Sequence, residues 1–224
     1  MSPLLLGHRG ARATRTVPEN TLQSFDLAMT HGCDGFEFDV RLTADGRAVI
    51  CHDGTVAGCA IAQAGATDLK HLPQLVSVLD RYGQQAFLDI EIKVPGLERS
   101  VMSALKLHPP QRGYVVSSFL TEVLQVLGEL DPDIPLGLIC EDSAQLTPWK
   151  SLPVQYVIPH HTLVDQDLVR TLHGDGKKIV VWTVNRREAM CHFRDIDVDG
   201  IVSDDTRLLV ETLRSGSQKL AAKS

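Results

Sequence analysis

Two acidic side chains alternate with apolar ones at residues 36–40, FEFDV. Neighbouring side chains of an extended strand point to opposite faces, so Glu37 and Asp39 share one face about 7 Å apart. If the aromatic face is buried, the acidic face lies in a confined environment, where ionised carboxylates require compensating charge. The pattern therefore predicts a bound cation, a basic side chain or both beside this strand.

A second segment at residues 87–93, FLDIEIK, repeats the alternation. It places Asp89, Glu91 and Lys93 on one face and three aliphatic side chains on the other. Carboxylate oxygens are the ligands that Mg²⁺ and Ca²⁺ prefer, whereas zinc sites are rich in nitrogen and sulfur. The two segments favour a divalent-cation site made of carboxylates. The alternative is a pair of edge strands with one solvated polar face.

Length and composition limit the class of protein. The 224 residues are 43% hydrophobic and 22% charged, which suits one globular domain over 1–224, with a flexible tail expected from about 216 to 224. The net charge of −6 argues against nucleic acid as a partner. Five cysteines without a C-x-x-C pair favour a reducing compartment. We see neither a signal peptide nor a membrane span, and expect a cytoplasmic protein without membrane insertion.

Strand-like runs alternate with amphipathic helical patterns along the whole chain, which is typical of a parallel α/β fold. The Asp45-Gly46 turn predicts a β-hairpin after the second of these strands, because such short turns join antiparallel strands. Eight parallel strands remain, so we predict a (β/α)8 TIM barrel, with a doubly wound open sheet as the alternative. The predicted strands are 3–8, 35–40, 48–52, 86–92, 113–117, 135–140, 155–159, 179–184 and 199–203. Helical patterns include 21–31, 72–82, 121–130, 165–172 and 186–193.

Functional side chains of such barrels gather where the strands end. In this sequence, polar residues lie at the end of one predicted strand after another. Polar residues scattered over the surface would not recur at strand ends. We therefore expect them to meet at one rim of the barrel. They are His8, Glu37, Asp39, His52, Glu91, Lys93, Ser117, Ser118, Trp182, Asn185, Ser203 and Asp204.

Several of these residues belong to short motifs that follow one another along the chain. The motifs are His8-Arg9-Gly10, Pro18-Glu19-Asn20-Thr21, Glu37-x-Asp39, His52-Asp53, Glu91-x-Lys93, Ser117-Ser118-Phe119, Trp182-Thr183-Val184-Asn185 and Gly200-Ile201-Val202-Ser203-Asp204. In this order they resemble the glycerophosphodiester phosphodiesterase family, over essentially the whole chain. The resemblance implies a barrel enzyme that hydrolyses glycerophosphodiesters to sn-glycerol 3-phosphate and an alcohol, with one divalent cation.

The resemblance also implies the roles of individual residues. Glu37, Asp39 and Glu91 become ligands of Mg²⁺ or Ca²⁺, and His8 and His52 become an acid–base pair. Two histidines that titrate near neutrality can take a proton from an attacking hydroxyl and give one to the leaving alkoxide. The attacking group is either a glycerol hydroxyl, which gives a cyclic phosphate, or water.

Basic residues are expected to face the phosphate. The resemblance assigns this role to Arg9 and Lys93, which would stabilise the negative charge that the transition state concentrates on the nonbridging oxygens. The position of Trp182 at a strand end favours a wall of the substrate pocket. Supporting roles are expected for Glu19 beside Arg9, Asp53 beside His52, and Asp89 lower in the barrel. Asn20 looks like the N-cap of the first helix.

The segment from 54 to 71 departs from the family pattern. It has only eighteen residues and is rich in alanine and glycine, whereas many family members carry a longer insertion that caps the site. We therefore predict a short or absent cap and an open pocket. Because few side chains can then reach the alcohol half of the substrate, we expect kcat/KM for different head groups to agree within about tenfold.

Two other functions fit parts of the pattern. A lysophospholipase D-like enzyme would share these residues but accept a lipid tail, and it would need an apolar rim, whereas the loops here are polar or small. A noncatalytic barrel that binds a phosphorylated ligand would not need two histidines. We therefore expect a small, water-soluble glycerophosphodiester as the substrate.

Overall fold

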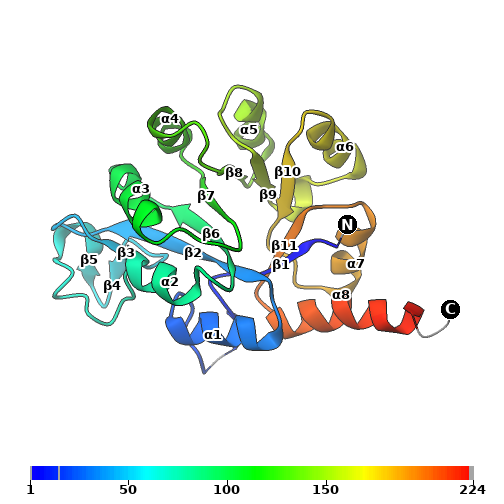
Figure 1. Cartoon of the computed structure of the whole chain (residues 1–224), viewed down its shortest axis with the longest axis horizontal. Coiled ribbons are helices and arrows are strands. Elements are labelled where there is room, and N and C mark those ends of the chain that lie inside the picture. The colour runs from blue at the N-terminus through cyan, green and yellow to red at the C-terminus, as the bar shows by residue number, and fades with distance from the viewer. Residues whose placement is uncertain (1, 15, 222–224) are drawn as a thin grey trace.

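Eight parallel strands close into a barrel in the computed structural model, which describes residues 2–14 and 16–221 (Figure 1). Strand β1 pairs with β11 on one side and with β2 on the other, so the sheet has no break. This closure confirms the predicted barrel and excludes the open sheet. The barrel strands are β1 (Leu4–Gly7), β2 (Gly35–Leu42), β6 (Phe87–Ile92), β7 (Tyr114–Ser118), β8 (Leu136–Cys140), β9 (Tyr156–Pro159), β10 (Lys178–Val181) and β11 (Gly200–Ser203).

Helices surround the strands on the outside of the barrel (Figure 1). They are α1 (Leu22–His31), α2 (Leu75–Tyr82), α3 (Glu98–Leu107), α4 (Thr121–Leu130), α5 (Ser143–Leu146), α6 (Gln166–Gly174), α7 (Arg187–Asp195) and α8 (Thr206–Ala221), with short 3-10 turns at η1 (Ile61–Gln63), η2 (Thr147–Lys150) and η3 (His161–Leu163). Helix α8 includes residues 216–221 of the predicted tail, whose flexibility stays a prediction. Residues 222–224 lie outside the described part. Among the helices within 2–14 and 16–221, none is both long and apolar enough to cross a membrane.

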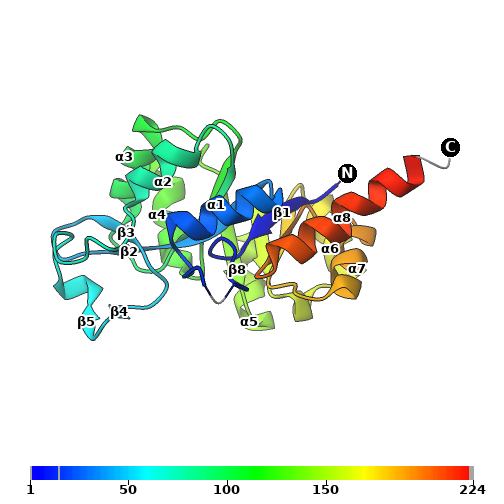
Figure 2. The ribbon, with the colours of Figure 1, turned by 90° about the horizontal axis from the view of Figure 1, so that it is seen from below.

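The predicted hairpin follows β2. Strand β3 (Ala48–Ile50) runs antiparallel to β2 and is therefore not a wall of the barrel. The short segment after it forms β4 (Thr55–Val56), β5 (Cys59–Ala60) and η1, which lie at the periphery (Figures 1 and 2). The segment is anchored by a small cluster of buried apolar side chains, namely Val49, Ile61, Ala64 and Leu69.

Strand β2 buries different side chains on its two faces, as its alternation predicts. Phe36 and Phe38 join the apolar layer between the strands and the helices, where Phe36 stacks on Phe25 of α1 with ring centroids 4.2 Å apart. Glu37 and Asp39 consequently point into the barrel. Below them the interior is filled by a second apolar cluster, made of Leu6, Phe87, Val115, Ile139, Tyr156, Ile158, Val180 and Val202.

Gly35 allows β2 to approach β6 at the start of their pairing. A Cβ atom at this position would lie 1.8 Å from the carbonyl oxygen of Phe87. We expect Gly35→Ala to lower the free energy of unfolding by at least ~2 kcal/mol, because the barrel wall must shift to relieve the overlap. Gly174→Ala is the matched control, since no atom lies within 4 Å of its added methyl group. Urea titration of both variants measures the difference; equal stabilities would contradict the prediction.

Candidate active site

Three carboxylates meet where the middle of β2 pairs with the C-terminal part of β6. The parallel register pairs Asp39 with Glu91 and Glu37 with Asp89. One oxygen from each of Glu37, Asp39 and Glu91 lies within 4.8 Å of the others, and all three residues are buried. Within the described residues, Glu37 Oε1 has no hydrogen-bond donor, and Asp39 Oδ1 has only an ion pair with Lys93 at 3.3 Å. A compact group of buried carboxylate oxygens, one of them without any donor, suits a hard divalent cation, so the set fits Mg²⁺ or Ca²⁺.

Burial and mutual repulsion set the protonation of this acidic cluster. Burial, reinforced by the charge of Asp39, raises the pKa of Glu37 well above its usual range. The same causes raise the pKa of Glu91 to about 7, and burial raises that of Asp89 to about 7. Burial acts in the same direction on Asp39, but Lys93 and Arg9 outweigh it and lower the pKa of Asp39. The cluster therefore holds more carboxylates than its basic neighbours can keep ionised.

Lys93 and Arg9 reach the acidic cluster from the segments that follow two different strands, β6 and β1. Lys93 Nζ lies 2.5 Å from Glu91 Oε1 and 3.3 Å from Asp39 Oδ1. Arg9 Nε lies 3.2 Å from Asp39 Oδ2, and the Arg9 backbone N–H donates to Glu37 Oε2 at 2.9 Å. Arg9 also donates from Nη1 to Glu19 at 2.7 Å, which is the contact expected from the sequence. Positive charge is thus held beside the carboxylates at a fixed place.

Asn20 differs from its predicted role as a helix cap. Thr21 is the N-cap of α1 and accepts from the backbone of Ser24, whereas Asn20 has a left-handed backbone with φ 56°. Its amide group donates from Nδ2 to Asp39 Oδ2 at 2.7 Å, and its Oδ1 accepts from the Asp39 backbone N–H. The prediction was wrong because this tertiary pairing with Asp39 turns the side chain away from the helix end.

The two predicted histidines lie at the same cavity, each beside a carboxylate. His8 Nδ1 lies 2.7 Å from Asp204 Oδ1, and its Nε2 lies 3.9 Å from Glu37 Oε2. His52 returns to the rim from the hairpin, with Nδ1 2.8 Å from Asp53 Oδ1. Since Nδ1 of each ring is occupied, Nε2 is the nitrogen left for a substrate.

Asp204 is a site residue whose role sequence analysis missed. Beyond His8, it accepts from Asn185 Nδ2 at 2.6 Å and lies 3.3 Å from Arg12 Nη1. Arg12 in turn contacts Glu19, so the groups behind His8 and Arg9 are connected. Burial opposes ionisation of Asp204, but the hydrogen bond from His8 and the contacts with Asn185 and Arg12 lower its pKa to about 2.

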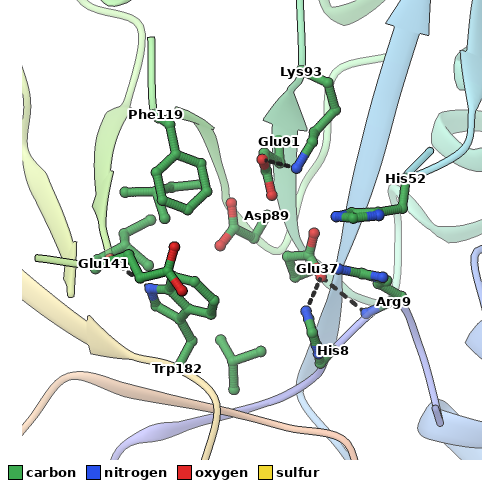
Figure 3. A pocket seen from close by; sticks show the side chains of 13 residues that line it. His8, Arg9, Glu37, His52, Asp89, Glu91, Lys93, Phe119, Glu141 and Trp182 are labelled. Carbon is green, nitrogen blue, oxygen red and sulfur yellow. Dashed lines mark hydrogen bonds and ion pairs between the residues drawn. The ribbon is translucent and has the colours of Figure 1, made fainter. Parts of the chain in front are cut away.

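The cavity at this rim has a volume of about 300 Å³ (Figure 3). Eight of the predicted site residues line it, namely His8, Arg9, Glu37, His52, Asp89, Glu91, Lys93 and Trp182. Asp39, Glu19 and Asp53 do not line it; Asp39 is fully buried, and the other two contact Arg9 and His52 from behind. Further lining comes from Phe119, Ile139, Glu141, Ile158 and Val202. Glu141 was also missed, although it directly follows a predicted strand.

The sequence matches the model of a known protein family over most of its length. The model of the glycerophosphoryl diester phosphodiesterase family matches residues 8–99 and 99–208. The chain belongs to this family. It is 30% identical to a glycerophosphodiester phosphodiesterase of Caldanaerobacter subterraneus subsp. tengcongensis, and the match covers 96% of this chain and 100% of the relative. Membership in the phosphodiesterase family confirms the enzyme class that the sequence motifs predict.

Solved structures of glycerophosphodiester phosphodiesterases share the fold. One from Parabacteroides distasonis ATCC 8503 matches with a TM-score of 0.87 and 25% identity, covering 97% of this chain and 99% of the other. A phosphodiesterase of Oleispira antarctica, solved in complex with the product sn-glycerol-3-phosphate, matches with a TM-score of 0.82 and 26% identity, covering 94% and 96%. The barrel predicted from the sequence is therefore the barrel of this family.

The low pKa of Asp204 makes part of the stability depend on pH. The folded pKa of about 2 lies below the unfolded value of about 3.9, so the contribution is present above about pH 4 and is lost as the pH falls through about 2. We expect the stability advantage of the wild type over Asp204→Asn to shrink by ~2 kcal/mol between pH 5 and pH 2. Urea unfolding across this range measures it. The exposed Asp133→Asn is the control, and a pH-independent difference would contradict the prediction.

Proposed function

We propose that this chain hydrolyses glycerophosphodiesters to sn-glycerol 3-phosphate and an alcohol with the help of one divalent cation, Mg²⁺ or Ca²⁺. The observation that carries the proposal is a cavity lined by two histidines and two basic side chains beside the cluster of Glu37, Asp39 and Glu91, of which Glu37 and Glu91 line the cavity. The Oleispira antarctica relative, which holds sn-glycerol-3-phosphate as its product, supports the same chemistry in a similar barrel.

The cation would be held by Glu37, Asp39 and Glu91. When bound, it would neutralise charge on the phosphate and on the oxygens that become negative in the transition state. Arg9 and Lys93 supply further positive charge from the same side of the cavity (Figure 3). Because both basic groups already contact the carboxylates, their positions are fixed before the substrate arrives, which is the condition for effective electrostatic stabilisation.

His8 and His52 divide the proton transfers. One ring takes the proton of the attacking hydroxyl, and the other gives a proton to the leaving alkoxide. Asp204 and Asp53 hold the Nδ1 sides of the two rings, so the Nε2 atoms are the ones that exchange protons with the substrate. The arrangement serves attack by a glycerol hydroxyl or by water, because either nucleophile loses one proton.

The cavity favours a small substrate over a lipid. The large apolar side chains that are exposed within the described residues are Val76, Leu107 and Val126, which belong to α2, α3 and α4 and do not line the cavity. A lysophospholipase D-like enzyme would need exposed apolar side chains around the cavity, whereas Phe119 and Trp182, the aromatic side chains that line it, are partly buried. A noncatalytic phosphate-binding barrel would have no use for two carboxylate-backed histidines.

The test is release of sn-glycerol 3-phosphate from the choline, ethanolamine and glycerol diesters, with and without a chelator. We expect release that stops on chelation and returns when Mg²⁺ or Ca²⁺ is added. Release that continues through prolonged chelation would refute the role of the cation. No release from any diester with either metal would refute the proposed activity.

We expect Asp204→Asn to lower kcat about tenfold and to leave KM nearly unchanged, because Asp204 positions His8 and does not line the cavity. If Asp204→Asn only damaged the structure, it would lower kcat equally in the wild type and in His8→Ala. In His8→Ala, by contrast, the loss caused by Asp204→Asn should largely disappear. Steady-state kinetics of the two single variants and the double variant decide the point, and additive losses would contradict a positioning role.

A further inference from the structure

The cavity has two unlike sides (Figure 3). The carboxylates, histidines and basic side chains described above occupy one side. Phe119 and Trp182 occupy the other, with ring centroids 5.7 Å apart in an edge-to-face arrangement. Phe119 borders the basic side, because Lys93 Nζ lies 5.8 Å from the centroid of its ring. Trp182 is held by a hydrogen bond from its indole N–H to the carbonyl oxygen of Ile158. The first side suits a phosphate, so the second is left for an organic group of the substrate.

Glu141 adds a carboxylate to the aromatic side. It directly follows β8, and its backbone N–H donates to Gln145 Oε1 at 2.7 Å, which fixes the chain at the mouth of the cavity. Figure 3 shows Glu141 on the same side of the cavity as Trp182. In the part of the chain that the structure describes, no hydrogen bond or ion pair joins the Glu141 carboxylate to another side chain.

This carboxylate is unfavourable for a purely anionic ligand. Phosphate is attracted to Arg9 and Lys93, but a negative group placed near Glu141 would be repelled. The charge pattern instead matches a zwitterion that carries its negative charge on the phosphate and a positive charge on its other end. Carboxylates and aromatic ring faces are the groups that bind ammonium ions, including quaternary ones.

We propose that Glu141, together with Trp182, binds the ammonium group of a zwitterionic glycerophosphodiester such as the choline or ethanolamine ester. This inference rests on the proposed function and deepens it, because it makes Glu141 a specificity-determining residue for the alcohol half. The segment from 54 to 71, which is small and peripheral, does not line the cavity. Discrimination among head groups therefore comes from the loop after β8.

The experiment compares kcat/KM of the wild type and Glu141→Gln for the choline, ethanolamine and glycerol diesters at low ionic strength. We expect Glu141→Gln to lower kcat/KM about tenfold for the two cationic esters and less than threefold for the glycerol ester. Glu122→Gln is the matched control, because Glu122 is exposed in the first turn of α4 and does not line the cavity. It should leave all three values unchanged.

Each other outcome has a distinct meaning. Equal losses on all three esters would overturn the inference, because they would place Glu141 against the glycerol phosphate half that the esters share. Unchanged values on all three esters would also overturn it. If the wild type releases no sn-glycerol 3-phosphate from any ester, the proposed function fails and the inference fails with it, a result that the wild-type arm alone identifies.

Discussion

We expect His8→Ala and His52→Ala each to lower kcat by at least ~10²-fold, which is the usual effect of removing a general acid or base. Each ring lines the cavity and has its Nδ1 beside a carboxylate, so alanine removes the Nε2 that we propose transfers the proton and leaves the acidic cluster in place. The measurement is steady-state turnover on a diester with a poor leaving group. His71→Ala is the control, because His71 is exposed and does not line the cavity.

The two histidines should also behave as one unit. If they handle the two proton transfers of one reaction, the double variant should be little slower than the slower single variant. Cation binding, followed by calorimetry, should remain in both single variants, since neither histidine belongs to the carboxylate group that fits the cation. Near-native turnover in either variant would show that the histidine replaced in it does not transfer a proton.

Much of the fold and of the site follows from local pattern. The alternation at 36–40 and 87–93 predicts which side chains face the helices and which face the barrel interior, and the structure has Phe36 and Phe38 outside and the acids inside. The Asp45-Gly46 turn predicts the hairpin that returns His52 to the rim. These features depend on residues that are neighbours along the chain, so they can be predicted from one sequence.

The missed features depend on distant contacts. Asp204 lies 196 positions from His8 along the chain, and only the pairing of β1 with β11 brings them together. Asparagine is a common residue at helix N-caps, yet the hydrogen bond of Asn20 with Asp39, 19 positions away, decides its conformation. Glu141 could have been found, because it follows a strand end in the same way as the other rim residues.

The second large effect is expected from a change in the carboxylate cluster. We expect Glu37→Gln to weaken the binding of Mg²⁺ or Ca²⁺ at least ~tenfold. We also expect it to lower kcat/KM at least ~10²-fold, because the phosphate loses electrostatic stabilisation. The amide oxygen of glutamine can still accept from the Arg9 backbone N–H, so the local fold is retained. Calorimetric titration of the metal-free protein and kinetic assays measure the two effects, with Glu122→Gln as the control.

Thermal unfolding separates loss of the cation from loss of the fold. Burial raises the pKa of Glu37, which means that the folded protein disfavours its charge when no cation compensates it. Glu37→Gln should therefore unfold at the wild-type temperature or above it in the presence of chelator. A cation at a hundred times its Kd stabilises the wild type by ~2.7 kcal/mol, and at the same concentration the variant should gain markedly less. If the variant gains as much stability from the cation as the wild type does, Glu37 is not a ligand, and the remaining carboxylates must hold the cation without it.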